Sequence, residues 1–200
     1  MIIATPLDIP RIEPDNWEVF WKIWQQESRY AVKVKTNVDT SLSPVGQDDL
    51  WTALDIYRRH DLKTAWEVPY YNIKDDLPIM YNTILNLPFK YVQSARLLIS
   101  QTDILAHTDD DRNKWSVRAI LHCNDPNPQW YFTQPGGTDR KFFNLPADTN
   151  WFAYNDHHCW HGSVFNNQYP KLLLQVFTFG DDTTIINSSI NKYKNYTIEL

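Results

Sequence analysis

Apolar side chains recur with helical spacing near the start of the chain. In residues 15–28 they fall at i, i+3, i+4 and i+7, which places them on one face of a helix. Asp15 stands at the N-cap position and Glu18 at the matching capping-box position. We expect an amphipathic helix packed on a sheet, with ligand stacking as the alternative role of its apolar face. That face comprises Trp17, Phe20, Trp21 and Trp24.

Two further segments before residue 88 are predicted to be helical. They are residues 48–58 and residues 75–86, the second of which has acidic residues at its start and Pro78 in its first turn. Between the first two helices, residues 30–46 begin with alternating polar and apolar side chains and end in a polar stretch. That pattern predicts a strand followed by a loop.

The pattern changes after residue 88, where short β-prone runs alternate with turn signals rich in Pro, Gly, Asn and Asp. Nine Trp, eleven Tyr and nine Phe also favour strands and a large buried core. Many short strands in this space are typical of a sandwich or jelly roll. We therefore predict an α+β, mainly β fold in which N-terminal helices pack on one sheet.

The length of 200 residues fits a single domain. Within it we expect a helical N-terminal elaboration over residues 1–88, a jelly-roll core over 89–180 and a C-terminal appendage over 181–200. No internal repeat or linker divides the chain.

Charge and cysteine content narrow the classes of partner. The net charge of −5 without a long basic run argues against a nucleic-acid partner. The first residues lack signal-peptide features, and no apolar run has the length of a membrane span. We expect a cytoplasmic protein with no membrane partner, in which Cys123 and Cys159 are reduced thiols. The oligomeric state is not indicated.

The candidate chemistry begins with His107 and Asp109, which stand two residues apart in a β-prone stretch. Side chains at i and i+2 of an extended chain project to the same side, so an imidazole and a carboxylate can meet one cation. A third ligand has to come from a distant strand. The candidates are His157, His158 and His161.

Two histidines and one carboxylate on one face of an octahedral ion leave three coordination sites open. This set suits non-haem Fe(II) that also binds a co-substrate and O2. A catalytic zinc site more often has three strong ligands and one open position.

Given these residues, the chain resembles the Fe(II)/2-oxoglutarate-dependent oxygenases over roughly residues 90–180. Members of that superfamily have a double-stranded β-helix, a cupin-like jelly roll, with His-x-Asp after one strand and a second histidine on a later strand. A basic residue about ten positions after that histidine pairs with the far carboxylate of 2-oxoglutarate. The resemblance implies Fe(II), 2-oxoglutarate and O2 as cofactor and co-substrates.

The basic residue discriminates among the three histidines. Lys171 stands ten positions after His161, whereas the corresponding positions for His157 and His158 hold Asn167 and Gln168. The resemblance therefore assigns His161 as the second histidine ligand, with His158 as its chief rival. The metal ligands that it implies are His107, Asp109 and His161.

The resemblance also implies a second cation for the co-substrate. The lysine matches the prolyl 4-hydroxylase-like branch, whereas the layout around the first histidine is similar to the aspartyl/asparaginyl β-hydroxylase-like group. In that group an arginine on the following strand helps hold the co-substrate. Arg118 stands at the matching position, and Arg112 is an alternative. Arg96 is a further candidate for contact with the co-substrate. The alternative for Lys171 is a solvent-exposed lysine at the edge of a strand, with no role in co-substrate binding.

The implied function is a 2-oxoglutarate-dependent hydroxylase that releases succinate and CO2. Its acceptor is expected to be an amino-acid or peptide side chain or a small metabolite. One competing hypothesis is a cupin-like metal enzyme that does not use 2-oxoglutarate and has no need of Lys171. Another is a catalytically silent β-sandwich used for binding, which would hold no stoichiometric iron.

Overall fold

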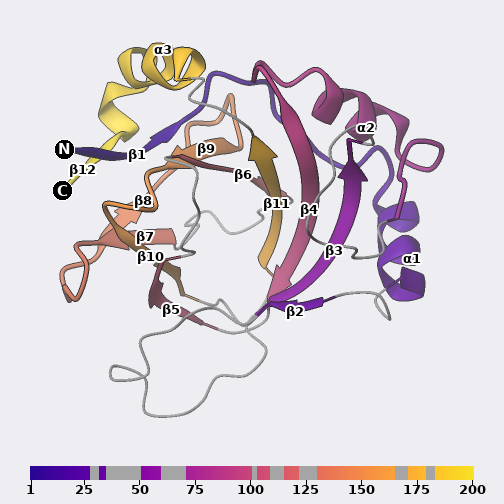
Figure 1. Cartoon of the computed structure of the whole chain (residues 1–200), viewed down its shortest axis with the longest axis horizontal. Helices are drawn as coiled ribbons and strands as arrows, with labels where there is room; N and C mark the ends of the chain where they lie inside the picture. Colours follow the sequence, from indigo (N-terminus) through magenta and orange to yellow (C-terminus); the bar gives the residue numbers. More distant parts are fainter. Residues whose placement is uncertain are drawn as a thin grey trace.

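The structure of the chain is a computed structural model. It describes residues 1–27, 32–34, 51–59, 71–100, 103–108, 115–121, 130–164, 171–178 and 183–200. Within these ranges the chain forms two antiparallel β-sheets and three α-helices, so the predicted α+β, mainly β class is confirmed (Figure 1). None of the described helices has the length and apolar character needed to cross a membrane.

The larger sheet has the strand order β12-β1-β9-β6-β11-β4-β3-β2, and the smaller has the order β5-β10-β7-β8. The helices are α1 (Trp17–Glu27), α2 (Pro78–Leu85) and α3 (Thr184–Lys192), and a short 3₁₀ helix spans Lys194–Tyr196. The strands are β1 (Ile2–Pro6), β2 (Val32–Val34), β3 (Trp51–Arg58), β4 (Val92–Ser100), β5 (Ile104–His107), β6 (Ser116–Leu121), β7 (Trp130–Thr133), β8 (Lys141–Phe143), β9 (Trp151–Tyr154), β10 (Trp160–Ser163), β11 (Lys171–Thr178) and β12 (Ile198–Glu199).

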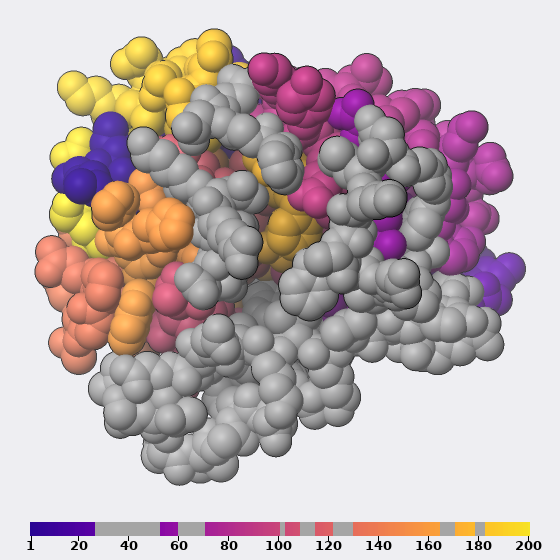
Figure 2. Space-filling view, viewed as in Figure 1, coloured from indigo at the N-terminus to yellow at the C-terminus, as the bar shows by residue number. Residues whose placement is uncertain are grey.

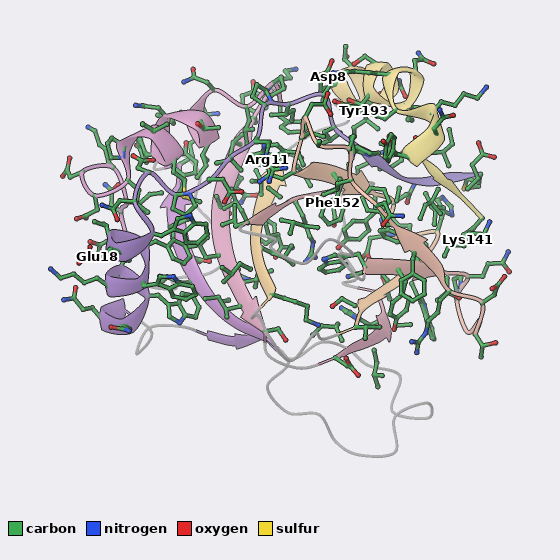
Figure 3. All side chains as sticks on the ribbon, turned by 180° about the vertical axis from the view of Figure 1, so that it is seen from behind. Asp8, Arg11, Glu18, Lys141, Phe152 and Tyr193 are labelled. Carbon is green, nitrogen blue, oxygen red and sulfur yellow. The ribbon has the colours of Figure 1, made fainter. Side chains whose placement is uncertain are left out.

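Each face of the larger sheet has its own apolar core, because successive side chains of a strand point to opposite faces. On β11, Leu172 and Leu174 belong to the core under the helices, whereas Leu173 belongs to the core shared with the smaller sheet. Side chains of all three helices contribute to the first core. Phe152 of β9 lies in the second, between the two sheets (Figure 3).

The predicted helices over residues 15–28 and 75–86 are present as α1 and α2, but the caps differ from expectation. Oδ1 of Asn16 accepts the Glu18 amide at 2.8 Å and so caps α1. The Asp15 carboxylate instead accepts the amides of Ile79 and Met80 at 2.7 and 2.8 Å, at the start of α2. Asp15, which the local pattern predicted as the cap of α1, therefore makes a tertiary contact with α2 instead.

The predicted helix over residues 48–58 is wrong, because its described part is strand β3. β3 pairs with β4 on one side and with β2 on the other. Leu54 and Ile56 pack in the core under the helices, whereas Ala53 packs in the core between the sheets. Pairing and two-sided burial therefore outweigh the helical appearance of this stretch.

Both ends of the chain contribute to the edge of the larger sheet. β1 pairs with β12, and the Met1 amino group donates to the Leu200 carbonyl at 2.8 Å. Figure 2 shows the N-terminal and C-terminal residues together on one side of the molecule. Residues 1–88 thus supply strands β1, β2 and β3 besides the two helices, and the stretch 181–200 supplies α3 and β12.

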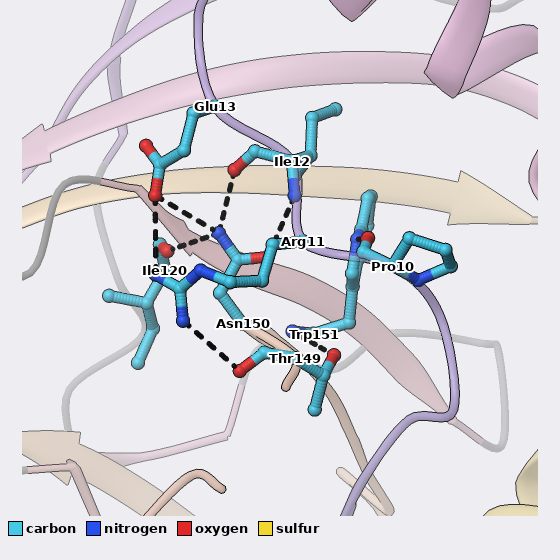
Figure 4. Close-up of polar contacts among 8 residues, drawn as sticks. All are labelled: Pro10, Arg11, Ile12, Glu13, Ile120, Thr149, Asn150 and Trp151. Carbon is cyan, nitrogen blue, oxygen red and sulfur yellow. Dashed lines mark hydrogen bonds and ion pairs between the residues drawn. The ribbon is translucent and has the colours of Figure 1, made fainter. Parts of the chain in front are cut away.

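Several hydrogen bonds hold the segment after β1 against the larger sheet, and three of them involve one buried amide side chain (Figure 4). Asn150 accepts the Ile12 amide at 3.0 Å and donates to the carbonyls of Ile12 and Ile120 at 2.7 and 2.9 Å. Because these bonds satisfy the donor and acceptor of the amide, its burial carries no desolvation penalty of an unpaired group. This contact fixes the path of the chain that leads to α1.

Candidate functional site

Two buried histidines face each other across neighbouring strands of the smaller sheet. β5 and β10 are antiparallel, and their register places His107 directly opposite His161. The two imidazole ring centroids are 4.4 Å apart, and the residues are only 3% and 1% exposed. The structure thus brings together two of the residues predicted as metal ligands, although they are far apart in the sequence.

Oxygen atoms adjoin the same nitrogen of both rings. Nδ1 of His107 donates to the Leu105 carbonyl at 2.7 Å, because a carbonyl can only accept. Nδ1 of His161 lies 3.4 Å from Oδ1 of Asp156, an ion-pair distance rather than a short hydrogen bond. In the neutral imidazole this arrangement places the lone pair on Nε2. The Tyr154 hydroxyl lies 3.3 Å from Nε2 of His161, within reach to donate to it.

The carboxylate of Asp156 also contacts the segment that carries His107. Oγ1 of Thr108 donates to Oδ2 of Asp156 at 3.0 Å, and its distance to the Asp156 carbonyl is 3.2 Å. Asp156 is 1% exposed. No sequence pattern predicted a role for this residue. An acidic residue between a buried aromatic strand and a candidate ligand was the available signal, but only the fold shows which groups it reaches.

The remaining sequence candidates near the histidines divide into two groups. Asp109 and Arg112 lie outside the described residues, and Thr108 is the last described residue before them. His157 and His158 are exposed on the turn before β10. Among the described residues, no group of three or more His, Cys, Asp or Glu side chains is arranged to hold a metal ion, and Asp109 is not among those residues.

Lys171 begins β11 of the larger sheet and reaches across to the smaller one. Its Nζ donates to Oγ of Ser163 at 2.8 Å, and Ser163 stands two residues after His161 on β10. Burial lowers the pKa of Lys171 to about 8, against an opposing effect of the Asp103 carboxylate. The ammonium group therefore faces the space beside β10, in a partly desolvated position.

Arg118 is a second basic side chain near the same histidine. The residue is buried, and its guanidinium stands 5.3 Å from the centre of the Tyr154 ring, which itself packs against His161 at 4.5 Å. Arg118 pairs in register with Gln175, four residues along β11 from Lys171. Because residues four apart on a strand point to the same face, Arg118 and Lys171 lie on one face of the larger sheet.

The structure also shows the contacts of two other residues considered in the sequence. Nε of Arg96 donates to Oδ1 of Asp55 at 2.6 Å, which gives that guanidinium a partner within the larger sheet. Cys159 is buried and free, and burial raises the pKa of its thiol to about 12. A thiol at that pKa is a poor nucleophile. Cys123 lies outside the described residues.

Comparisons with known proteins leave the family open. No protein-family model matches the sequence, and no curated protein matches it either. Solved structures give weak likenesses. An oxidoreductase of the 2OG-Fe(II) oxygenase family from Burkholderia pseudomallei is 16% identical, with a TM-score of 0.37 over 64% of this chain and 66% of that one. A Pseudomonas putida prolyl-4-hydroxylase is 13% identical, with a TM-score of 0.37 over 80% of this chain and 85% of that one. At such TM-scores the likeness does not assign the chain to a family.

Proposed function

We propose that the chain is an Fe(II)- and 2-oxoglutarate-dependent oxygenase. Its acceptor is an amino-acid or peptide side chain or a small metabolite, which it hydroxylates. One observation carries the proposal: two buried imidazoles from separate strands face each other, and each has an oxygen atom beside Nδ1. In this reading the two sheets are the layers of a double-stranded β-helix, with the site between them.

The donor set fits an iron ion. Metal-ligating histidines almost always donate the second ring N–H to a carbonyl or carboxylate. Nδ1 of His107 makes such a bond, and Nδ1 of His161 has a carboxylate oxygen at 3.4 Å. His107 and His161 would supply Nε2, and Asp109 would supply the carboxylate. Bound iron, with 2-oxoglutarate and O2, supplies the oxidising chemistry, in which the co-substrate becomes succinate and CO2.

The protein's part is to bind the co-substrate and keep water away. Lys171 pairs with the far carboxylate of 2-oxoglutarate, which replaces the Ser163 hydroxyl as its partner. Arg118 adds positive charge on the same face of the larger sheet as Lys171. Aromatic side chains surround that histidine: the Trp130 ring lies 6.1 Å from it, close to parallel, and the Tyr154 ring lies 4.5 Å from it. Such a lining excludes water from the reacting groups.

Lys171→Ala is expected to weaken 2-oxoglutarate binding about 10- to 150-fold, because a charge-assisted bond contributes about 1.5–3 kcal/mol. Fe(II) affinity should stay unchanged, since Lys171 is not a ligand. Anaerobic binding titrations of Fe(II) and then of 2-oxoglutarate measure both affinities. Lys171→Arg is the matched control, which keeps the charge and should keep most of the co-substrate affinity.

Normal 2-oxoglutarate binding by Lys171→Ala would remove the proposed role of this lysine. If the wild-type protein bound iron but not 2-oxoglutarate, the cupin-like metal enzyme would replace the oxygenase as the function. If the wild-type protein bound neither iron nor 2-oxoglutarate, the remaining hypothesis would be a catalytically silent β-sandwich used for binding.

Co-substrate affinity is expected to decrease as the pH rises through about 8. The ammonium form of Lys171 is the form that pairs with a carboxylate, and its low pKa means that this form declines above that pH. Above that pKa, the dissociation constant should increase roughly tenfold per pH unit, as far as binding depends on the ammonium. Titrations on both sides of pH 8 measure the effect. Lys171→Arg should show no such inflection, and an identical inflection in that variant would assign the effect to another group.

A further inference from the structure

A buried carboxylate that the proposed chemistry does not use stands beside the histidine pair. Asp156 is 1% exposed, in the turn between β9 and β10. Burying an ionised carboxylate is costly unless partners compensate it. The Thr108 hydroxyl, 3.0 Å from Oδ2, and the His161 ring, 3.4 Å from Oδ1, are two partners of this carboxylate.

These two partners belong to the two segments that carry the proposed histidine ligands. Thr108 directly follows His107, and its hydroxyl lies within reach of both the carboxylate and the carbonyl of Asp156. His161 follows Asp156 by five residues. One side chain thereby links the end of β5 to the start of β10, in addition to the pairing of the two strands.

The carboxylate also selects one form of the His161 ring. An ionised carboxylate only accepts hydrogen bonds, so it favours the tautomer with the proton on Nδ1. The opposite tautomer would direct a lone pair at a negative charge. The favoured form leaves the lone pair on Nε2, where the Tyr154 hydroxyl lies at 3.3 Å.

We infer that Asp156 is a positioning residue for metal binding: it orients His161 with Nε2 as the donor and, through Thr108, holds His107 opposite it. This inference rests on the proposed function, because it presupposes a metal between the two rings. It adds to that function a residue that does not itself contact the ion.

Asp156→Asn tests the inference with a side chain of the same shape that lacks the charge. Anaerobic titration with Fe(II), and with Co(II) followed by its visible absorption, should show affinity reduced about 10- to 100-fold. The matched control is Asp148→Asn. The Asp148 carboxylate is exposed, accepts from the Tyr193 hydroxyl at 2.9 Å and lies 3.3 Å from Nζ of Lys192. It should keep wild-type metal affinity.

Thr108→Val and Thr108→Ser keep the test decisive if Asp156→Asn does not fold. Valine removes the hydroxyl bond to the carboxylate and should lower metal affinity. Serine retains the hydroxyl and should keep metal affinity close to that of the wild-type protein. Thermal unfolding of each metal-free variant distinguishes a role in metal binding from a role in stability alone. A role in stability alone would lower the unfolding temperature and leave metal affinity unchanged. That result would overturn the inference. Failure of the wild-type protein to bind any metal would instead overturn the proposed function.

Discussion

His107→Ala and His161→Ala are each expected to abolish stoichiometric Fe(II) binding and all iron-dependent succinate formation. Each substitution removes one of two imidazole donors that lie opposite each other on β5 and β10. A three-ligand site that loses a donor retains too few protein ligands to hold Fe(II) against water. Iron analysis after desalting and a succinate assay with added Fe(II) and 2-oxoglutarate measure the two losses.

His158→Ala is the control, since this histidine is exposed three residues before the proposed ligand. It should bind iron as the wild-type protein does. If His158→Ala lost iron while His161→Ala kept it, the assignment of the second histidine would be wrong. Retention of iron and succinate formation by both His107→Ala and His161→Ala would remove the proposed centre.

Gly162→Ala is expected to destabilise the protein and to remove metal binding as well. A Cβ at this position would lie 2.6 Å from the Ile104 carbonyl and 2.5 Å from the Tyr131 hydroxyl. A tyrosine side chain can move, but the Ile104 carbonyl belongs to the backbone of β5. Adding the methyl group therefore forces β5 away from β10 and separates the two histidines that this pairing holds together. Overpacking of this kind costs about 1–3 kcal/mol and occasionally more.

Gly136→Ala is a matched control for that experiment. Gly136 has a φ of 71° and open space around its Cβ position, so the same substitution strains only the backbone. It should lower the free energy of unfolding by about 1–2 kcal/mol and leave Fe(II) affinity unchanged. Denaturant unfolding and iron titration compare the two variants. Wild-type stability and iron affinity in Gly162→Ala would contradict the close approach of β10 to β5.

Local patterns predicted elements wherever the local signal and the tertiary contacts agree. The apolar spacing in residues 15–28 corresponds to α1, and Pro78 begins α2. The pattern failed at Trp51–Arg58, because a strand buried on both faces lacks the alternation that distinguishes strand from helix. It also assigned Asp15 to the wrong helix, since nothing local shows that this carboxylate reaches α2.

Only those residues of the candidate site that have a characteristic spacing or match a known family could be predicted from the sequence. His107 and His161 were identified in this way, and the structure places them face to face. Asp156 was not, because its meaning depends on which side chains surround it. Ser163 as the partner of Lys171 was likewise not foreseen, since that contact joins strands of different sheets.

The most direct test of the proposed function is an anaerobic titration of the wild-type protein with Fe(II) and 2-oxoglutarate, observed by visible absorption. A chelate of 2-oxoglutarate on protein-bound Fe(II) has a weak charge-transfer band. We predict a saturable band that requires protein, metal and co-substrate together, reaches one equivalent of iron per chain and is absent from His161→Ala. No band and no bound iron in the wild-type protein would contradict the account.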